Sequence, residues 1–481
     1  MIKMVVNSYL KLINNYKRNL FLDYVSYIFC LLFIISGTIV SVVRYWQYEV
    51  FYYDFGIFDQ AIWNVSRLKE PIIDHLAVGG KWIFADHFNP SIFFLSPLYW
   101  FTERSEILLV AQATIVGLSG LLLYRIGLDI TKNRIVSLSV LSCYLLFVGT
   151  QNAIITDFHE VTISTLPFLL TFWSAIKNKP LWYFIFLIIT LGFKESNFLL
   201  GIGISIALFF IKKDWFKISI ITLLISSLWG FLSIKLIIPY FAGGIYQYST
   251  EFPNRISQLF FLFDAEVKRR TIFFSFLSFG FLPLFSPAFY FLILQDLLIR
   301  FYPNSTTRWD LGLHYSIQLA AIFGISALYG YKFITKYLKV KNIDIIVSLG
   351  LFINIIFLHR FILHGPFGLS YNGSFYKHTS DFSFLDDLIK KIPKNASVMT
   401  QNNLAVRFDH QKVWILRPSY SSYKPNYILI DNRKGQSPNN FFGSSHIEQI
   451  IADILRDSDY KLTYHTGEQY IFEKRNNINL K

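Results

Sequence analysis

Charged residues are scarce in this chain. Only 16% of its 481 residues are Asp, Glu, Lys or Arg, whereas 53% are hydrophobic and the mean hydropathy is +0.41. Because soluble domains carry about 25% charged residues, this balance excludes an ordinary soluble protein. About a dozen apolar runs instead predict an α-helical multi-pass membrane protein.

Cysteine is almost missing, and no motif for nucleotides or nucleic acids is present. Cys30 and Cys143 both lie inside apolar runs, which excludes a disulfide framework and a thiolate metal site. No Gly-rich phosphate loop, internal repeat or low-complexity tract stands out. The net charge of +14 therefore does not indicate nucleic acid, and we expect no such partner.

The basic residues concentrate in short segments between the apolar runs, as the positive-inside rule predicts. The first run follows Lys11, Lys17 and Arg18 and is too long for a signal-peptide core, so we expect a cytoplasmic N-terminus. Four basic segments then fall on the cytoplasmic side: 125–134, 177–179, 212–217 and 332–341. The expected membrane segments, about eleven, are 24–43, 106–126, 135–153, 161–176, 181–193, 197–211, 217–238, 271–285, 287–301, 314–335 and 343–362.

Two of these apolar stretches are interrupted. Lys194 and Glu195 divide 181–211, and Pro283 and Pro287 divide 271–301. A single span over 271–301 would place the basic segment 332–341 outside, so the charge bias favours a hairpin. Short broken spans tend to line a cavity, and both hairpins are candidates for lining the site.

The expected domain organisation has two parts. Residues 1–363 form the transmembrane domain, whose long first outer loop is 44–105, and residues 364–481 form a small extracytoplasmic α/β domain. Strands are expected around 397–399, 413–416, 427–430 and 470–472, with helices at 382–391 and 446–455. In the first loop, apolar residues on one face of 56–68 predict a helix that lies on the membrane surface.

Asp54 and Asp59 are the first candidate catalytic residues. Asp54 lies among aromatic residues beyond the first span, where partial desolvation favours a carboxylate that accepts a proton from a hydroxyl. The alternative is that Asp54 caps the helix that follows. Asp59 lies about 140° around that helix, so the two carboxylates are not expected to share one proton.

Two further polar clusters follow in the outer segments. His87 has the chemistry to donate to a phosphate or bind a metal, although a single His is more often an ordinary hydrogen-bonding residue. Asp157, His159 and Glu160 offer an acid or metal site, but the spacing from Asp157 to Glu160 also matches a helix capping box. If a metal binds, the hard oxygen ligands favour Mg or Mn, and the sequence leaves the metal unknown.

The remaining candidates are Lys194, Glu195, Arg308, His314 and Tyr315. Ionisable residues between apolar half-spans usually pair or serve a site, so Lys194 and Glu195 form either a self-neutralising pair or part of a binding site. Arg308 has the geometry to hold a phosphate with two hydrogen bonds, whereas aromatic anchoring at the interface is the alternative for Tyr315. All the clusters are expected on one membrane face.

These motifs resemble a family of predicted bacterial and archaeal membrane proteins that is known only as a domain of unknown function within the GT-C glycosyltransferase superfamily. The motifs that carry the resemblance are Tyr53–Asn64, His87–Pro90, Asp157–Glu160, Lys194-Glu195, His314-Tyr315 and, in the tail, Ile392–Val398 and Asn426–Asp431. Two departures are Ser196, where relatives commonly have Asp, and Phe55, where superfamily enzymes often have an acidic residue. The first removes one carboxylate, and the second disfavours a metal role for an acidic pair at Asp54.

The resemblance implies an inverting transfer of a sugar from a polyprenyl-phosphate carrier to an acceptor glycan, lipid or protein at the outer face of the cell membrane. Asp54 would be the base, with Lys194, His87, Arg308 and His314 as candidates that stabilise the departing lipid phosphate. A transporter or lipid flippase would also use intramembrane charges, but should show related halves. A non-catalytic membrane scaffold would leave the Lys194 and Glu195 pair unexplained.

Overall fold

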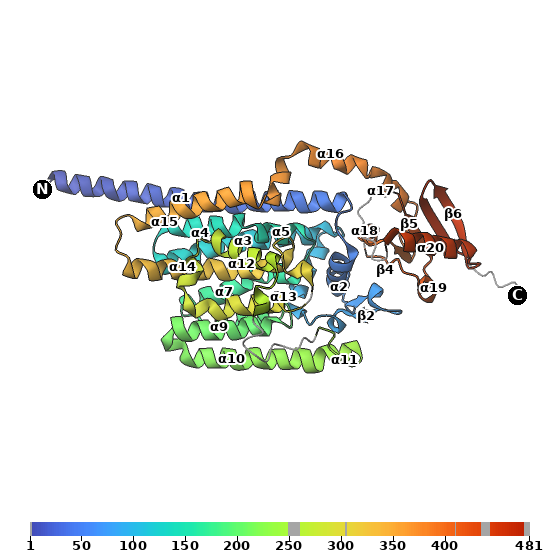
Figure 1. The fold of residues 1–481 in the computed structure, drawn as a ribbon, viewed down its shortest axis with the longest axis horizontal. Coiled ribbons are helices and arrows are strands. Elements are labelled where there is room, and N and C mark those ends of the chain that lie inside the picture. Colours follow the sequence, from blue (N-terminus) through green and yellow to red (C-terminus); the bar gives the residue numbers. More distant parts are fainter. Residues whose placement is uncertain (1, 249–259, 304, 409, 434–442, 476–481) are drawn as a thin grey trace.

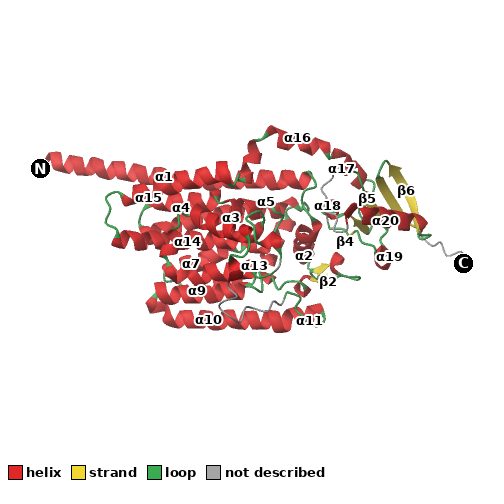
Figure 2. Ribbon diagram, viewed as in Figure 1, coloured by secondary structure: helices red, strands yellow, loops and turns green. Residues whose placement is uncertain are grey.

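A computed structural model describes residues 2–248, 260–303, 305–408, 410–433 and 443–475. A bundle of roughly parallel and antiparallel helices makes up most of the molecule, and the N-terminus lies at one end (Figure 1). A smaller strand-containing region lies at the opposite end of the bundle (Figure 2). The long axis of the bundle therefore separates the start of the chain from its C-terminal region.

Five helices in the described residues are long and apolar enough to cross a membrane, or six segments if one bent pair forms a single span. The long helices are α1 (Ile2–Trp46), α3 (Glu106–Thr131), α10 (Phe216–Phe231) with its extension η6 (Leu232–Ile237) and α11 (Ile238–Ala242), α14 (Ile317–Tyr337), and α15 (Ile343–Phe357) with η12 (Leu358–Ile362). The pair α4 (Arg134–Leu146) and α5 (Val148–Ile155) is bent by 46°.

The other apolar stretches form shorter helices. They are α6 (Glu160–Ile163), α7 (Thr165–Ile176), α8 (Pro180–Leu191), α9 (Asn197–Ile211), α12 (Glu266–Ser278) and α13 (Tyr290–Phe301). An α-helix needs about 20 residues to cross a bilayer, so these fall short of full spans and the count of eleven is not confirmed. The two interruptions are real: α8 and α9 are separated at 192–196, and Pro283 and Pro287 begin the short turns η8 (Leu282–Phe285) and η9 (Pro287–Phe289) between α12 and α13.

Close contact between small residues and backbone holds the bundle together. A Cβ atom added to Gly330 of α14 would lie 2.0 Å from the carbonyl oxygen of Leu282, so only glycine lets the turn at η8 pack there. Between lipid-exposed helices no water is expelled, and such close packing supplies much of the attraction. Cys30 and Cys143 are buried in this core as free cysteines.

The first loop folds into short elements between the bundle and the C-terminal region. They are η1 (Tyr52–Gly56), α2 (Ile57–Ser66), β1 (Ile72–Ile73), η2 (Asp74–Leu76), β2 (Lys81–Trp82), η3 (Ile83–Ala85) and η4 (Pro90–Trp100). The expected helix over 56–68 is present as α2, but its first six residues are all buried. The helix packs mainly against η4, with further contacts to η1 and β1, and its placement on the membrane surface stays a prediction.

A five-stranded sheet organises the C-terminal region, which begins with η13 (Pro366–Tyr371). The strand order is β4-β3-β5-β7-β6; β4, β3 and β5 are parallel, and β7 and β6 are antiparallel additions. The strands are β3 (Val398–Thr400), β4 (Val413–Ile415), β5 (Tyr427–Asp431), β6 (Tyr460–Thr466) and β7 (Gln469–Lys474). The helices are α16 (Gly373–Asp381), α17 (Ser383–Ile389), α18 (Asn402–Ala405), α19 (Tyr420–Tyr423) and α20 (Gly443–Arg456).

Candidate functional site

Asp54 lies in η1, a single π-helical turn that follows the end of α1. Such turns replace the ordinary helical hydrogen bonds and often occur at functional sites. The turn depends on Gly56, because a Cβ atom there would lie 2.1 Å from the ring of Tyr52. Asn402 of α18 accepts a hydrogen bond from the backbone N–H of Tyr53 at 2.8 Å. The C-terminal region thus directly contacts the turn that carries Asp54.

The Asp54 carboxylate is half-buried and has no hydrogen-bond or ion-pair partner in the part of the chain that the structure describes. It does not cap α2, whose N-cap is Gly56 without a side-chain hydrogen bond. The capping interpretation of Asp54 is therefore wrong. A carboxylate without a structural partner remains available to a ligand.

Asp157 and His159 lie beside Asp54, in the break 156–159 that follows α5. Burial, and after it the charge of Asp54, raises the pKa of Asp157 well above its usual range, although Phe51 donates a backbone hydrogen bond. Burial lowers the pKa of His159, against the opposing effect of Asp54. The ring nitrogen Nδ1 of His159 contacts the carbonyl oxygen of Thr156 at 2.9 Å. This end of the bundle therefore holds two neighbouring carboxyl groups: Asp157, whose protonation is favoured, and the half-exposed Asp54.

The expected capping box from Asp157 to Glu160 does not form. The N-cap of α6 is His159, and no side chain caps the helix. Asp157 has φ +50°, which turns the chain sharply before α6. Glu160 instead reaches Lys194 Nζ at 2.7 Å. The sequence pattern was a coincidence of spacing.

Two histidines stack at the centre of the cluster. The ring centroids of His159 and His314 are 3.5 Å apart, and those of His314 and Tyr315 are 4.0 Å apart. His314 is buried, and its Nδ1 has no hydrogen-bond partner among the residues that the structure describes. The guanidinium of Arg308 lies 5.8 Å from the centre of the Tyr315 ring. One continuous contact path thus leads from His159 to Arg308.

Lys194 and Glu195 do not pair with each other, so the alternative of a self-neutralising pair is wrong. Lys194 pairs with Glu160, whereas Oε1 of Glu195 contacts Nδ1 of His87 at 2.9 Å. Oε2 of Glu195 also accepts the backbone N–H of Phe88 at 3.3 Å. The break 192–196 is therefore bonded to two separate segments. One is the start of α6, and the other is the pair of residues shortly before η4.

These contacts shift the ionisation of Glu195 and His87. Burial acts to raise the pKa of Glu195, but the neighbouring His87, and after it Lys194, lowers it to about 2. Burial acts to lower the pKa of His87, yet the charge of Glu195 raises it above its usual value. Both pKa shifts favour the charged forms, so His87 is an imidazolium that pairs with the Glu195 carboxylate.

Three residues of the segment after α11 complete this pair, and the sequence analysis missed them. The Tyr246 hydroxyl donates a hydrogen bond to Glu195 at 2.8 Å. The Tyr248 hydroxyl and the Gln247 amide both donate to Asp86, each at 2.6 Å. The ring of Tyr248 also stacks on His87 at 4.6 Å. The signal in the sequence was weak: Gly243 and Gly244, both with positive φ, mark a turn just before two tyrosines.

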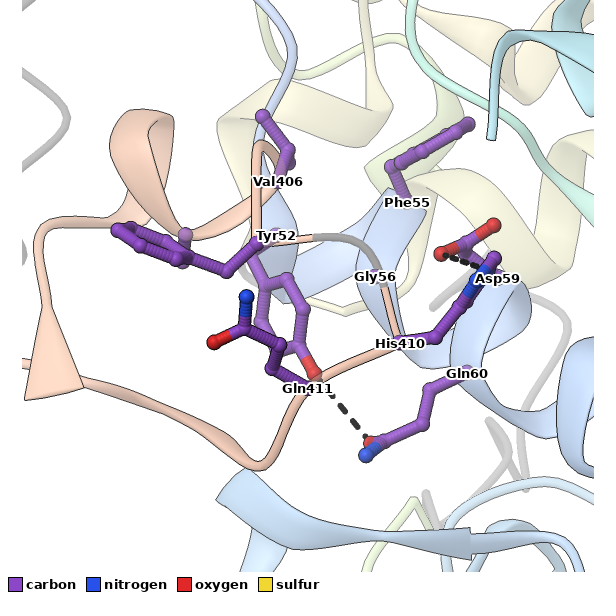
Figure 3. Close-up of a pocket in the computed structure, with 10 residues that line it drawn as sticks. Tyr52, Phe55, Gly56, Asp59, Gln60, Val406, His410 and Gln411 are labelled. Carbon is purple, nitrogen blue, oxygen red and sulfur yellow. Dashed lines mark hydrogen bonds and ion pairs between the residues drawn. The ribbon is translucent and has the colours of Figure 1, made fainter. Parts of the chain in front are cut away.

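Asp59 lies against the C-terminal region, beside His410. It accepts hydrogen bonds from the hydroxyl groups of Tyr99 and, at 3.0 Å, Ser105, and His410 lies 3.4 Å away. Figure 3 shows Asp59 beside His410 at a small pocket of about 10 Å³, which is room for about one water molecule. These contacts tie Asp59 to the junction between α2 and the C-terminal region, apart from the histidine cluster.

The candidate metal ligands diverge. His159 contacts Thr156, Glu160 pairs with Lys194, and Asp157 accepts the Phe51 amide. Among the described residues, no group of three or more His, Cys, Asp and Glu side chains is arranged to hold a metal ion. The residues named for Mg or Mn each have a hydrogen-bond or ion-pair partner within the protein.

A family model described as "Predicted membrane protein (DUF2079)" matches residues 44–469. The chain belongs to this family. No curated protein matches the chain. The DUF2079 match includes all the candidate residues from Asp54 to Tyr315, together with the sheet region that contacts η1. The match thus begins at the end of α1 and ends at the start of β7, and the roles of individual residues rest on the geometry described above.

Proposed function

We propose that this protein transfers a sugar from a polyprenyl-phosphate carrier to an acceptor hydroxyl at the outer face of the cell membrane. One observation carries the proposal: the half-exposed Asp54 carboxylate, without a partner among the described residues, borders a buried group of imidazoles and cations. A general base needs such a free carboxylate within reach of the acceptor. The coarser finding on which it builds is a membrane protein with several apolar helices.

The transfer would be a single displacement with inversion. Asp54 takes the proton of the acceptor hydroxyl while the oxygen forms a bond to the anomeric carbon of the sugar. The bond between that carbon and the phosphate oxygen breaks, and its electron pair leaves with the lipid phosphate. The negative charge that develops on the phosphate then requires cations or hydrogen-bond donors.

Arg308 is the cation best placed to hold this phosphate. Lys194 and His87 already pair with carboxylates, whereas Arg308 has no carboxylate partner in the described part of the chain. A guanidinium can bind two phosphate oxygens at once. His314, whose Nδ1 lacks a partner in the described ranges of the chain, lies between Arg308 and the histidine next to Asp54. Lys194 and His87 then serve to hold their segments in position.

The test replaces Asp54 with Asn, which keeps the shape of the side chain but removes its basicity. A general base contributes about 10²–10⁴-fold in rate. We expect Asp54→Asn to lower the release of free polyprenyl phosphate by about that factor, measured on membranes supplied with a panel of polyprenyl-phosphate sugars. Asp387→Asn, on the exposed surface of α17, is the matched control. Full release by Asp54→Asn, with a sugar donor that the unaltered protein uses, would exclude the role.

Asp59→Asn is expected to behave differently from Asp54→Asn. Asp59 accepts two hydroxyl hydrogen bonds and lies beside His410, so its replacement should weaken the junction with the C-terminal region. We expect a smaller loss of transfer than for Asp54→Asn, accompanied by a lower thermal stability. Asp54→Asn should leave that stability unchanged.

A further inference from the structure

A cavity of about 530 Å³ opens on the side of the bundle, apart from Asp54 and Lys194. It lies between α5, α12, the segment 310–312 and the end of η12. Its apolar lining includes Val148, Phe274 and Ile362, and its charged lining is Glu266, Arg270 and Asp310. Cavities of about 300–1,000 Å³ with a few polar groups are typical small-molecule sites.

The apolar part of the cavity opens towards the bilayer. Ile362, which lines it, is 42% exposed, and the neighbouring Phe361 and Phe273 are 62% and 51% exposed. Aromatic and aliphatic side chains exposed on a membrane bundle face hydrocarbon. A ligand that occupies the whole cavity must therefore be apolar at one end and charged at the other, as a lipid is.

The charged part of the cavity selects the headgroup. One cation, Arg270, faces two carboxylates, Glu266 and Asp310, on the same lining. A headgroup with only negative charge would meet both carboxylates, whereas one with a phosphate and an ammonium group pairs with residues of both signs. We propose that the cavity binds an aminophospholipid, with its phosphate at Arg270 and its ammonium group at Asp310 and Glu266.

Binding there would also support the histidine cluster. Trp309 accepts a hydrogen bond from Thr271 at 2.6 Å, and Leu311 accepts one from Asn152 at 2.8 Å, through their carbonyl oxygens. The same segment continues to His314, so a lipid against residues 310–312 braces the wall between the cavity and the stacked histidines. This inference does not depend on the sugar-transfer proposal, because it concerns a lipid that is not consumed.

The experiment uses the full chain, stripped of lipid in detergent and examined by native mass spectrometry. Phosphatidylethanolamine and phosphatidylglycerol with identical acyl chains are added in competition. We expect one phosphatidylethanolamine per chain, preferred by about tenfold, because charged hydrogen bonds decide the choice. Equal binding of the two lipids overturns the proposal without the need for any variant, as does preferential retention of a polyprenyl phosphate.

Two variants locate the site. Arg270→Gln and Asp310→Asn should each weaken retention of phosphatidylethanolamine by about tenfold. Arg269→Gln is the matched control, because Arg269 is adjacent and exposed but donates to Phe263 outside the cavity. Retention that is unchanged in both cavity variants would overturn the assignment to this cavity.

Discussion

The partner of each ionisable residue decides what that residue can do. Glu160 and Glu195 are buried, and each is held by a cation or an imidazole from another segment. Removal of one member of a buried pair leaves an uncompensated charge, so such pairs fix geometry rather than take part in turnover. Asp54, by contrast, has no such partner in the described residues. The same residue type therefore serves two purposes within one cluster.

The pair of Glu195 and His87 predicts a dependence of stability on pH. The pKa of Glu195 falls from 4.5 to about 2, so its contribution is complete above pH 4.5 and is lost as the pH falls towards 2. The pKa of His87 rises above 6.5, so its contribution is complete below pH 6.5 and is lost as the pH rises through the raised value. Both contributions are present together between these limits.

We therefore expect Glu195→Gln to lower the thermal unfolding midpoint most at about pH 5.5, by the equivalent of about 3 kcal/mol, and less at about pH 9.5. The measurement is a thermal melt of the purified protein at both pH values. The matched control is Glu473→Gln, because Glu473 pairs with the half-exposed Lys461 and such surface pairs contribute little. A loss that is larger at the higher pH would contradict the assignment of an ionised pair.

At the scale of elements, apolar patterning predicted where helices and strands lie. The strands expected in the tail are present as β3, β4, β5 and β7, and the expected helices as α17 and α20. β6 was missed because its exposed side chains leave little apolar signal in Tyr460–Thr466. The breaks at 192–196 and between α12 and α13 followed from Lys194, Glu195 and two prolines. Local composition carries these features, so sequence sufficed for them.

Contacts between distant segments could not be predicted in the same way. The pairing of Lys194 with Glu160, and of Glu195 with His87, depends on how the short helices pack rather than on spacing along the chain. The burial of α2 likewise depends on its packing against η4, which spacing along the chain does not predict. The shared location of the candidate residues was expected, but the hydrogen bond from Tyr53 to Asn402 had no signature in the sequence.

That hydrogen bond predicts a coupling between the C-terminal region and η1. Asn402→Ala removes the acceptor for the Tyr53 backbone N–H. Because such a hydrogen bond contributes about 1 kcal/mol, amide exchange of this turn should become about fivefold faster. Hydrogen exchange of peptides over 51–57 measures the effect in the full chain. Asn372→Ala, which removes the cap of α16, is the control and should leave η1 unchanged. Equal exchange in both variants would show that the C-terminal region does not hold η1.

At the scale of the whole molecule, the basic segments between the helices and the candidate residues around Asp54 lie at opposite ends of the bundle. Three of the basic segments and the start of α15 meet at the end of the bundle nearer the N-terminus. Lys177 pairs with Asp129, Lys212 bonds to Asn178, and Asn133 bonds to Asp344. The candidate cluster and the C-terminal sheet lie at the other end (Figure 1). This polarity supports the proposed topology, in which the basic end is cytoplasmic and the C-terminal region lies outside.

Two variants, each with one added cysteine, test that topology. Glu468→Cys places a thiol on the exposed turn between β6 and β7, and Lys339→Cys places one in the exposed segment between α14 and α15. The native Cys30 and Cys143 are buried and should react little. In intact cells a membrane-impermeant maleimide should label Glu468→Cys, whereas Lys339→Cys should react only after permeabilisation. The positive charges of the second segment hold it inside, and transferring them across the bilayer is costly. The opposite pattern would invert the molecule in the membrane and would place Asp54 on the cytoplasmic side, where the proposed acceptor would have to be sought instead.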